Sequence, residues 1–171
     1  MTRLMPAAPA PALDVATAVG PWSLAAQTPA SFTVIAFYRG FHCPICKGYL
    51  TELNRLVPDF AAAGAGVIVV SMDPADRAAK AVADWGLDKL TVGYGLTEAQ
   101  ARDWNLYLTD SIKDAETQVF AEPGLFLVDA TGKLYLINIA SMPFARPDVA
   151  SLPAKISFAV ANGYPARGTR A

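Results

Sequence analysis

The sequence has little charge, a single histidine and only two cysteines, and these shortages exclude several classes of function. Its 171 residues carry 14 lysines and arginines against 15 aspartates and glutamates, a net charge of −1. Without a basic excess, nothing in the composition favours a nucleic acid or an anionic membrane surface as partner. The longest apolar stretch, residues 61–72, is broken by glycine and is too short to span a bilayer. The hydrophobic fraction of 53% instead predicts a globular domain with a sizeable core.

The first residues do not have the pattern of a secretion signal. Arg3 supplies one positive charge, but prolines at positions 6, 9 and 11 break the apolar helix that such a signal needs. We therefore expect a cytoplasmic protein. The division of the chain that we expect is a flexible alanine- and proline-rich leader (residues 1–12), a single domain (residues 13–165) and a loose tail (residues 166–171).

Hydrophobic periodicity divides the rest of the chain into strands and helices. Alternation near the N-terminus predicts a hairpin over residues 13–27 that turns at Gly20 and Pro21. Residues 32–38 and 66–72 are mostly apolar and do not alternate with polar residues, which is typical of strands that are covered on both faces. The remaining pattern predicts helices over residues 44–64, 74–86, 97–104 and 148–162, a strand over residues 90–94, and a strand pair over residues 126–129 and 134–139.

This order of elements predicts an α/β fold with a mixed sheet. We expect a thioredoxin-like sandwich, in which a mixed central β-sheet is flanked by helices and carries an N-terminal β-hairpin extension. Residues 105–122 fit only an extended loop or a surface strand. Among single side chains, we expect Trp85 and Trp104 in the core, Asp73 as a helix N-cap, and Glu122 in solvent.

The two cysteines, Cys43 and Cys46, lie three positions apart in the sequence Cys-Pro-Ile-Cys, a spacing that chance seldom produces. They follow the first long strand, where its helix begins. If that helix starts near Pro44, Cys43 lies at the N-cap, where unpaired N–H groups and the helix dipole favour a thiolate. Cys43 is then the catalytic nucleophile towards a peroxide or a disulfide, and Cys46 is the catalytic resolving thiol. We expect no bound cofactor and no metal.

Two other interpretations of the cysteine pair stay open. In the first, the chain is a non-catalytic thioredoxin-fold module that binds a soft metal ion such as copper(I), or a protein partner, through the two sulfurs. A structural zinc ion needs four ligands, and His42 is the only histidine in the chain. In the second, the cysteines are inert residues at a strand-to-helix turn.

Three segments of the chain point to a known family. They are residues 37–47 around the cysteines, residues 70–74 (Val-Ser-Met-Asp-Pro), and residues 123–132, which begin Pro-Gly-Leu-Phe-Leu-Val-Asp. Together they resemble the peroxiredoxin-like branch of the alkyl hydroperoxide reductase and thiol-specific antioxidant family, within the thioredoxin superfamily. The resemblance implies an antioxidant thiol oxidoreductase that reduces hydroperoxides or protein disulfides. It also implies an external thiol reductant of the thioredoxin or glutathione type, and it admits a homodimer.

The chain departs from the family pattern at two places. In the family motif Pro-x-x-x-Thr-x-x-Cys the threonine holds the peroxide, whereas this chain has Gly40 there and Ala36 at the proline position. The family's activating arginine corresponds to Pro123, where thioredoxins carry a proline, usually cis, that faces the cysteines. The resemblance thus implies a peroxiredoxin-like body whose site is closer to that of thioredoxin or glutaredoxin. Supporting roles are expected for Arg39, which could replace the missing charge, and for His42, Pro44, Lys47 and Pro123.

Overall fold

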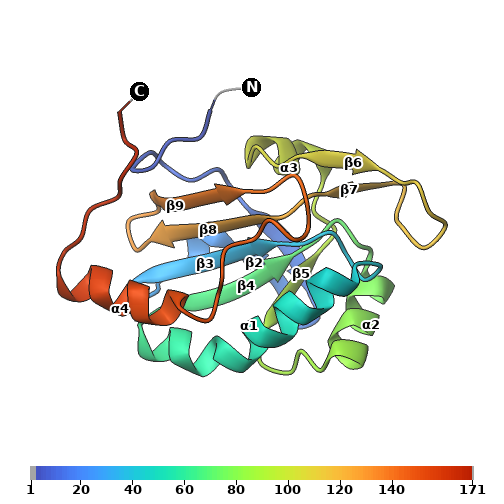
Figure 1. Cartoon of the computed structure of the whole chain (residues 1–171), viewed down its shortest axis with the longest axis horizontal. Coiled ribbons are helices and arrows are strands. Elements are labelled where there is room, and N and C mark those ends of the chain that lie inside the picture. The colour runs from blue at the N-terminus through green and yellow to red at the C-terminus, as the bar shows by residue number, and fades with distance from the viewer. Residues whose placement is uncertain (1–2, 171) are drawn as a thin grey trace.

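A seven-stranded mixed β-sheet forms the centre of the molecule (Figure 1). The computed structural model describes residues 3–170. The strands are β1 (Asp14–Thr17), β2 (Gly20–Ser23), β3 (Phe32–Phe37), β4 (Gly66–Val70), β5 (Thr91–Tyr94), β6 (Leu108–Asp110), β7 (Val119–Ala121), β8 (Gly124–Asp129) and β9 (Leu134–Ile139). The helices are the short 3₁₀ helix η1 (Leu24–Ala26) and the α-helices α1 (Pro44–Ala62), α2 (Ala75–Trp85), α3 (Glu98–Asp103) and α4 (Leu152–Ala161).

Strand β3 lies inside the sheet, whose order is β2-β1-β5-β4-β3-β8-β9. It pairs in parallel with β4 and antiparallel with β8. Helix α1 connects β3 to β4 and helix α2 connects β4 to β5, as parallel strand pairs require. The hairpin β1–β2 extends the sheet through antiparallel pairing of β1 with β5. The expected α/β fold, with a mixed sheet, flanking helices and an N-terminal hairpin, is confirmed.

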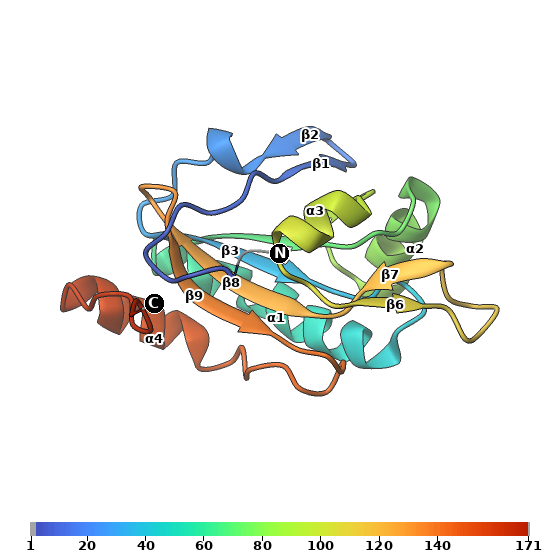
Figure 2. The same cartoon turned by 90° about the horizontal axis from the view of Figure 1, so that it is seen from above.

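Different elements cover the two faces of the sheet (Figure 2). Helices α1, α2 and α4 pack on one face, against a set that includes Val34 and Ala36 of β3. Helix α3 packs on the other face, against a set that includes Ile35. As expected, Trp85 and Trp104 are buried, the first on the α1 side and the second on the α3 side. This double cover explains why β3 is apolar at successive positions instead of alternating with polar residues.

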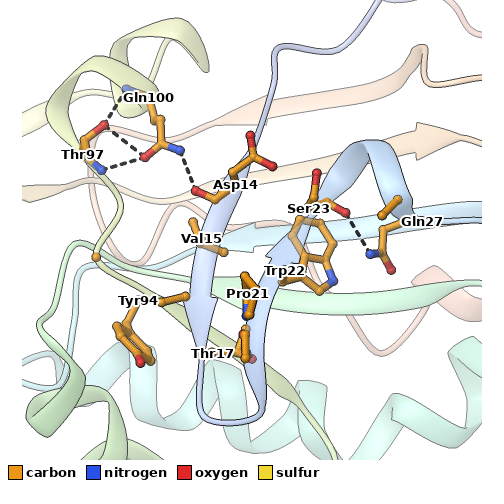
Figure 3. Close-up of a pocket in the computed structure, with 14 residues that line it drawn as sticks. Asp14, Val15, Thr17, Pro21, Trp22, Ser23, Gln27, Tyr94, Thr97 and Gln100 are labelled. Carbon is orange, nitrogen blue, oxygen red and sulfur yellow. Dashed lines mark hydrogen bonds between the residues drawn. The ribbon is translucent and has the colours of Figure 1, made fainter.

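A groove of about 910 Å³ lies between the hairpin and the start of α3 (Figure 3). Trp22 of β2 and Tyr94 of β5 are among the residues that line it. Gln100 forms a capping box with Thr97, and its Nε2 donates to the Asp14 carbonyl oxygen at 2.7 Å. This bond fastens α3 to β1. None of the residues expected at the cysteine site lines the groove.

The N-terminal hairpin turns earlier than expected. Thr17 pairs directly with Gly20, so the turn consists of residues 18 and 19. The Thr17 hydroxyl donates to the Gly20 carbonyl oxygen at 2.7 Å and accepts the Val19 N–H at 3.3 Å. These two bonds close the turn, and Gly20 and Pro21 therefore begin the second strand.

In the second half of the chain, hydrophobic periodicity did not predict the structure of residues 105–122 or the first residue of α4. Residues 105–122 include the small hairpin of β6 and β7, so the surface-strand interpretation fits this stretch better than an extended loop. Helix α4 begins at Leu152 and not at residue 148, with Pro153 in its first turn, where proline is tolerated. Neither α4 nor any other helix within residues 3–170 is long and apolar enough to cross a membrane.

The segment that we expected to be a flexible leader makes backbone hydrogen bonds with the turn between β8 and β9. Ala7 N–H donates to the Leu134 carbonyl oxygen at 2.7 Å, and Leu134 N–H donates to the Ala8 carbonyl oxygen at 2.9 Å. Ala10 N–H donates to the Gly132 carbonyl oxygen at 2.9 Å. The division of the chain into leader, domain and tail stays a prediction, but residues 7–10 of the expected leader are bonded to residues 132–134 in this structure.

Candidate active site

Both cysteines lie at the N-terminus of α1, just beyond the carboxyl end of β3. Cys43 is the N-cap residue, with extended backbone angles, and Pro44 is the first helical residue. The Sγ atoms of Cys43 and Cys46 are joined in a disulfide, with the two Cα atoms 5.2 Å apart. The Cys46 N–H also donates to Cys43 Sγ at 3.2 Å. The pair is buried: Cys43 is 2% exposed and Cys46 is 0% exposed.

This position favours negative charge on the sulfur of Cys43. The first N–H groups of a helix have no partner within the helix, and its positive dipole end points towards the N-cap. The N–H that contacts Cys43 Sγ in the disulfide is therefore placed to stabilise a thiolate after reduction. The first turn of α1 contains no acidic residue that would oppose this charge. The arrangement is suited to cycling between a dithiol and a disulfide.

A buried aspartate fixes the loop between β3 and α1. Asp73 accepts the Phe41 N–H through Oδ2 at 2.7 Å and the Arg77 Nε–H through Oδ1 at 3.1 Å. Our expectation that Asp73 caps a helix is wrong, because Pro74 occupies the N-cap of α2 and the Asp73 carboxylate turns inward to the loop. Gly40 has a φ of +130°, and a Cβ atom there would lie 2.7 Å from Asp73 Oδ1. The threonine of the family motif has no room at this position.

The side chain of Arg39 contacts a network of carboxylates. Its Nε lies 3.4 Å from Glu122 Oε1 and its Nη2 lies 4.0 Å from Glu116 Oε1. Its guanidinium carbon is 4.7 Å from the centre of the Phe120 ring. Glu122 Oε1 also accepts the Thr109 hydroxyl at 2.7 Å. Glu122 is thus buried and not solvated as expected: Arg39 and Thr109 contact its Oε1, whereas its Oε2 is buried without a hydrogen-bond partner among the described residues. The supporting role of Arg39 stays a prediction.

His42, the residue before the first cysteine, is half-buried against Phe120, with the two ring centres 4.7 Å apart. Burial lowers the pKa of His42 from its ordinary value of 6.5, and the positive charge of Arg39 lowers it further. Asp73 and Glu116 act in the opposite direction. The imidazole is therefore neutral at pH 7 and able to accept a proton. Its participation in proton transfer at the cysteines stays a prediction.

The lowered pKa of His42 should make the protein less stable in mild acid. As the pH falls, the unfolded chain takes up the proton first, so stability is complete above about pH 6.5 and decreases below it. The His42→Asn variant should lack this decrease when urea unfolding is followed from about pH 7.5 to about pH 5. Because His42 is the only histidine, one imidazole NMR signal gives its pKa directly, and a value at or above 6.5 would contradict the prediction.

The other expected supporting residues lie in different environments, and their roles stay predictions. Pro44 is exposed at the first helical position, where its missing N–H costs nothing. Lys47 is exposed on α1, and its backbone N–H donates to the Cys43 carbonyl oxygen at 3.1 Å. Pro123 is buried between β7 and β8, and its carbonyl oxygen accepts the Ala140 N–H at 2.9 Å, which continues the β8–β9 ladder. No described peptide bond is cis, so Pro123 lacks the isomer that is usual in thioredoxins.

Arg146 contacts the disulfide, and sequence reasoning missed it. It lies between β9 and α4, one hundred positions after Cys46. Its Nη2 donates to Cys46 Sγ at 3.0 Å and its Nη1 donates to the Pro143 carbonyl oxygen at 2.6 Å. Its guanidinium carbon lies 5.0 Å from the centre of the Tyr49 ring on α1. No motif surrounds Arg146, so no sequence signal connects it with the cysteines.

The structure offers few ligands for a metal ion. Within residues 3–170, no group of three or more histidine, cysteine, aspartate or glutamate residues is arranged to hold one. Metal binding through the pair would therefore rely on Cys43 and Cys46 with few protein ligands beside them. Two sulfurs are fewer than the four ligands of a structural zinc site.

The fold and the site define a class of protein: a thioredoxin-fold thiol oxidoreductase whose redox pair begins α1. A family model described as the AhpC/TSA family matches residues 6–137, more than half of the chain. The chain belongs to the AhpC/TSA family, and it is a thiol-dependent oxidoreductase of the peroxiredoxin-like kind. A search of curated protein sequences finds no match.

Solved structures of peroxiredoxins and of a thiol–disulfide interchange protein share the fold. Peroxidoxin BcpB from Mycobacterium tuberculosis is 14% identical, with a TM-score of 0.73 over 94% of this chain and 98% of that one. The bacterioferritin comigratory protein of Xanthomonas campestris is 20% identical, with a TM-score of 0.65 over 88% and 91%. A putative thiol:disulfide interchange protein DsbE from Chlorobium tepidum is also 20% identical, with a TM-score of 0.68 over 91% and 99%. At these identities the likeness establishes the thioredoxin-like fold.

Proposed function

We propose that the protein reduces hydroperoxides, with Cys43 as the attacking thiolate and Cys46 as the resolving thiol. The observation that carries the proposal is the bonded pair at the N-cap of α1, where Cys43 Sγ accepts an N–H and Cys46 Sγ is already within bonding reach. A thiolate is the nucleophile in peroxide reduction, and the helix N-terminus favours it. A partner thiol on the same helical turn captures the oxidised sulfur quickly.

The proposed cycle balances in atoms and electrons. The Cys43 thiolate attacks one oxygen of ROOH and the O–O bond breaks. The alcohol ROH leaves after taking up a proton, while Cys43 becomes a sulfenic acid. The Cys46 thiol then attacks Cys43 Sγ, forming the disulfide and releasing water. Two equivalents of an external thiol reduce the disulfide and leave as their own disulfide.

The burial of the pair supports a small oxidant over a protein disulfide. A protein disulfide has to bring its own sulfur into line with the attacking thiolate, which requires an attacking sulfur that protrudes from the surface. Cys43 is 2% exposed in the disulfide state. A hydroperoxide needs only a narrow approach to one sulfur atom. Thiol–disulfide exchange is therefore the second candidate function. It is favoured by Gly40 and Pro123, which stand where the family carries the threonine and arginine of peroxide reduction.

The partners that we propose follow the same chemistry. The reductant is an external thiol, and the burial that favours a small oxidant also favours a small thiol of the glutathione type over a protein thiol of the thioredoxin type. It attacks Cys43, the less covered of the two cysteines. The cytoplasm, where such thiols are kept reduced, is the compartment that we propose. A homodimer is proposed from the family resemblance alone.

Intact mass measured after brief exposure to peroxide tests the function. The fully reduced chain is mixed with equimolar hydrogen peroxide, quenched within seconds and weighed. We expect each chain to lose two hydrogens, because the sulfenic acid at Cys43 is captured by Cys46 as soon as it forms. The Cys43→Ser variant, which lacks the attacking sulfur, serves as the control and should keep its mass.

Two other results would overturn hydroperoxide reduction. Oxidation that takes minutes with peroxide but seconds with a small protein disulfide would assign the pair to thiol–disulfide exchange. Inertness to both oxidants, together with uptake of copper(I) by anaerobically purified protein, would assign it to a binding module.

A further inference from the structure

We propose that Arg146 is a catalytic residue of the reductive half-reaction, which stabilises the thiolate that leaves from Cys46 when an external thiol attacks Cys43. The inference rests on the proposed function in one respect: it takes the Cys43–Cys46 disulfide as the oxidised state of a working cycle. The arginine comes from the segment between β9 and α4, whereas the position that the family resemblance assigns to an activating arginine holds Pro123.

The first argument is the contact itself. Arg146 Nη2 donates to Cys46 Sγ at 3.0 Å, within the range of a hydrogen bond to sulfur. The guanidinium is held in place by a second bond, from Nη1 to the Pro143 carbonyl oxygen, and by its position over the Tyr49 ring. Tyr49 in turn donates its hydroxyl to the Pro147 carbonyl oxygen at 3.1 Å. The segment that carries Arg146 is thus fastened to α1 beside the cysteine that Arg146 contacts.

The second argument is that this cation lacks a counter-charge. Within residues 3–170, Arg146 forms no ion pair with a carboxylate. Its charge is influenced by Tyr49 on α1, Glu122 between β7 and β8, and Arg39 after β3. Burial raises the pKa of Tyr49 well above its ordinary value, so Tyr49 stays neutral, and burial lowers the pKa of Arg146 to about 10. A thiolate on Cys46 would supply the anion that the partly buried guanidinium lacks.

The third argument is that each sulfur has its own donor. Cys43 Sγ accepts the N–H of Cys46, which belongs to the helix N-terminus, whereas Cys46 Sγ accepts a hydrogen bond from a side chain of another element. The helix therefore stabilises charge on the attacking cysteine and Arg146 stabilises charge on its partner. Cys46 is fully covered and Cys43 is the less covered of the two, so we expect the incoming thiol to attack Cys43.

The chemical step follows from this division. An external thiolate attacks Cys43 Sγ, a new S–S bond forms between them, and the Cys43–Cys46 bond breaks. Its electron pair goes to Cys46 Sγ, which becomes a thiolate beside Arg146. A second external thiolate then attacks the external sulfur of the mixed disulfide and releases Cys43 as a thiolate. A leaving thiol of lower pKa leaves faster, so Arg146 accelerates the first displacement and favours the reduced state.

The experiment compares Arg146→Met, which removes the charge at similar volume, with Arg146→Lys, which keeps it. The disulfide is formed with diamide, so the test does not depend on peroxide as a substrate. We expect Arg146→Met to shift the equilibrium with glutathione about tenfold towards the protein disulfide, which corresponds to about 30 mV. The rate of reduction by dithiothreitol should fall by about tenfold as well. Arg146→Lys should retain most of both quantities, and circular dichroism reports whether the variants fold.

A matched control is available elsewhere on the chain. Arg167 also lies over a tyrosine ring, 6.0 Å from the centre of Tyr164, and also donates a hydrogen bond, to the Tyr164 hydroxyl. It is exposed and contacts no sulfur. Arg167→Met should therefore leave the glutathione equilibrium and the reduction rate unchanged.

The pKa of Cys46 separates a charge effect from a packing effect. In the Cys43→Ser background, ultraviolet thiolate absorbance titrates Cys46 alone, and Arg146→Met should raise its pKa by about 1. An unchanged pKa of Cys46, or a wild-type glutathione equilibrium in Arg146→Met, would overturn the proposal. If peroxide fails to oxidise the reduced protein while these shifts appear, the proposed oxidant is wrong and the role of Arg146 stands.

Discussion

The Cys43→Ser variant is expected to lose hydroperoxide turnover by at least about a thousandfold, because a serine hydroxyl in place of the thiolate cannot take up oxygen from a peroxide. The loss should appear in a coupled assay with an external thiol, at constant protein concentration. The variant should fold normally, since Cys43 contributes one small buried side chain and serine is a good N-cap residue. Hydroperoxide turnover close to that of the wild type would mean that Cys43 is not the reacting sulfur.

The Cys46→Ser variant is the natural comparison for this prediction. It keeps the attacking thiolate and its position at the helix N-cap but removes the resolving thiol. With equimolar peroxide it should gain one oxygen as the sulfenic acid of Cys43 and go no further until an external thiol reacts with it. Equal behaviour of the two single variants would contradict the division of roles between the cysteines.

Substitution of Gly40 by alanine is expected to destabilise the fold by about 2–5 kcal/mol. Two effects combine at this position. The φ of +130° lies in a region that side chains other than glycine rarely adopt, and the new Cβ would lie 2.7 Å from the buried Asp73 carboxylate. Urea unfolding followed by tryptophan fluorescence measures the change. Gly40→Thr, which restores the residue type of the family motif, should be at least as destabilising and should not raise peroxide turnover.

Two further variants separate the backbone strain at Gly40 from the steric clash of a new Cβ with Asp73. Gly95 also has a positive φ, +71°, but a Cβ there would meet nothing within 4 Å, so Gly95→Ala should cost only about 1 kcal/mol. In the Asp73→Ala background, where the carboxylate is absent, Gly40→Ala should cost about 1–3 kcal/mol less than in the wild type. Equal losses for Gly40→Ala and Gly95→Ala would show that crowding by Asp73 is unimportant.

Much of the fold could be predicted from the sequence because its signals are local. The apolar run that became β3, the helical spacing behind the cysteines and the capping box of Thr97 and Gln100 each specify a structure within a few residues. Boundaries shifted where a side chain made an unexpected local bond, as Thr17 does at the turn of the first hairpin. The pairing of β6 with β7 depends on contacts between short strands, for which the sequence carries little periodicity.

The residues of the site also fall into two groups: those that local sequence predicts and those that contacts between distant segments place. The positions of Cys43 and Pro44 at the start of α1 could be predicted, because an N-cap followed by proline is a local motif. The burial of Glu122, the inward turn of Asp73 and the contact of Arg146 with Cys46 arise only when distant segments meet. From sequence alone, a charged residue in a loop is expected to be solvated, because the segment that covers it in the fold is distant in the chain.

Because β3 pairs with a strand on each side, a structural change on oxidation or reduction of the cysteines is expected outside the sheet. Strand β3 is held along both edges, by β4 and by β8, up to Phe37. Displacing its end would break the hydrogen bonds to β4 and to β8 at once, so the sheet next to the cysteines is rigid. Residues 140–148, in contrast, join the rest of the molecule through a few single bonds, among them those of Tyr49 and Arg146. Reduction of the disulfide should therefore displace residues 140–148, which contact Cys46 through Arg146, before it displaces the sheet.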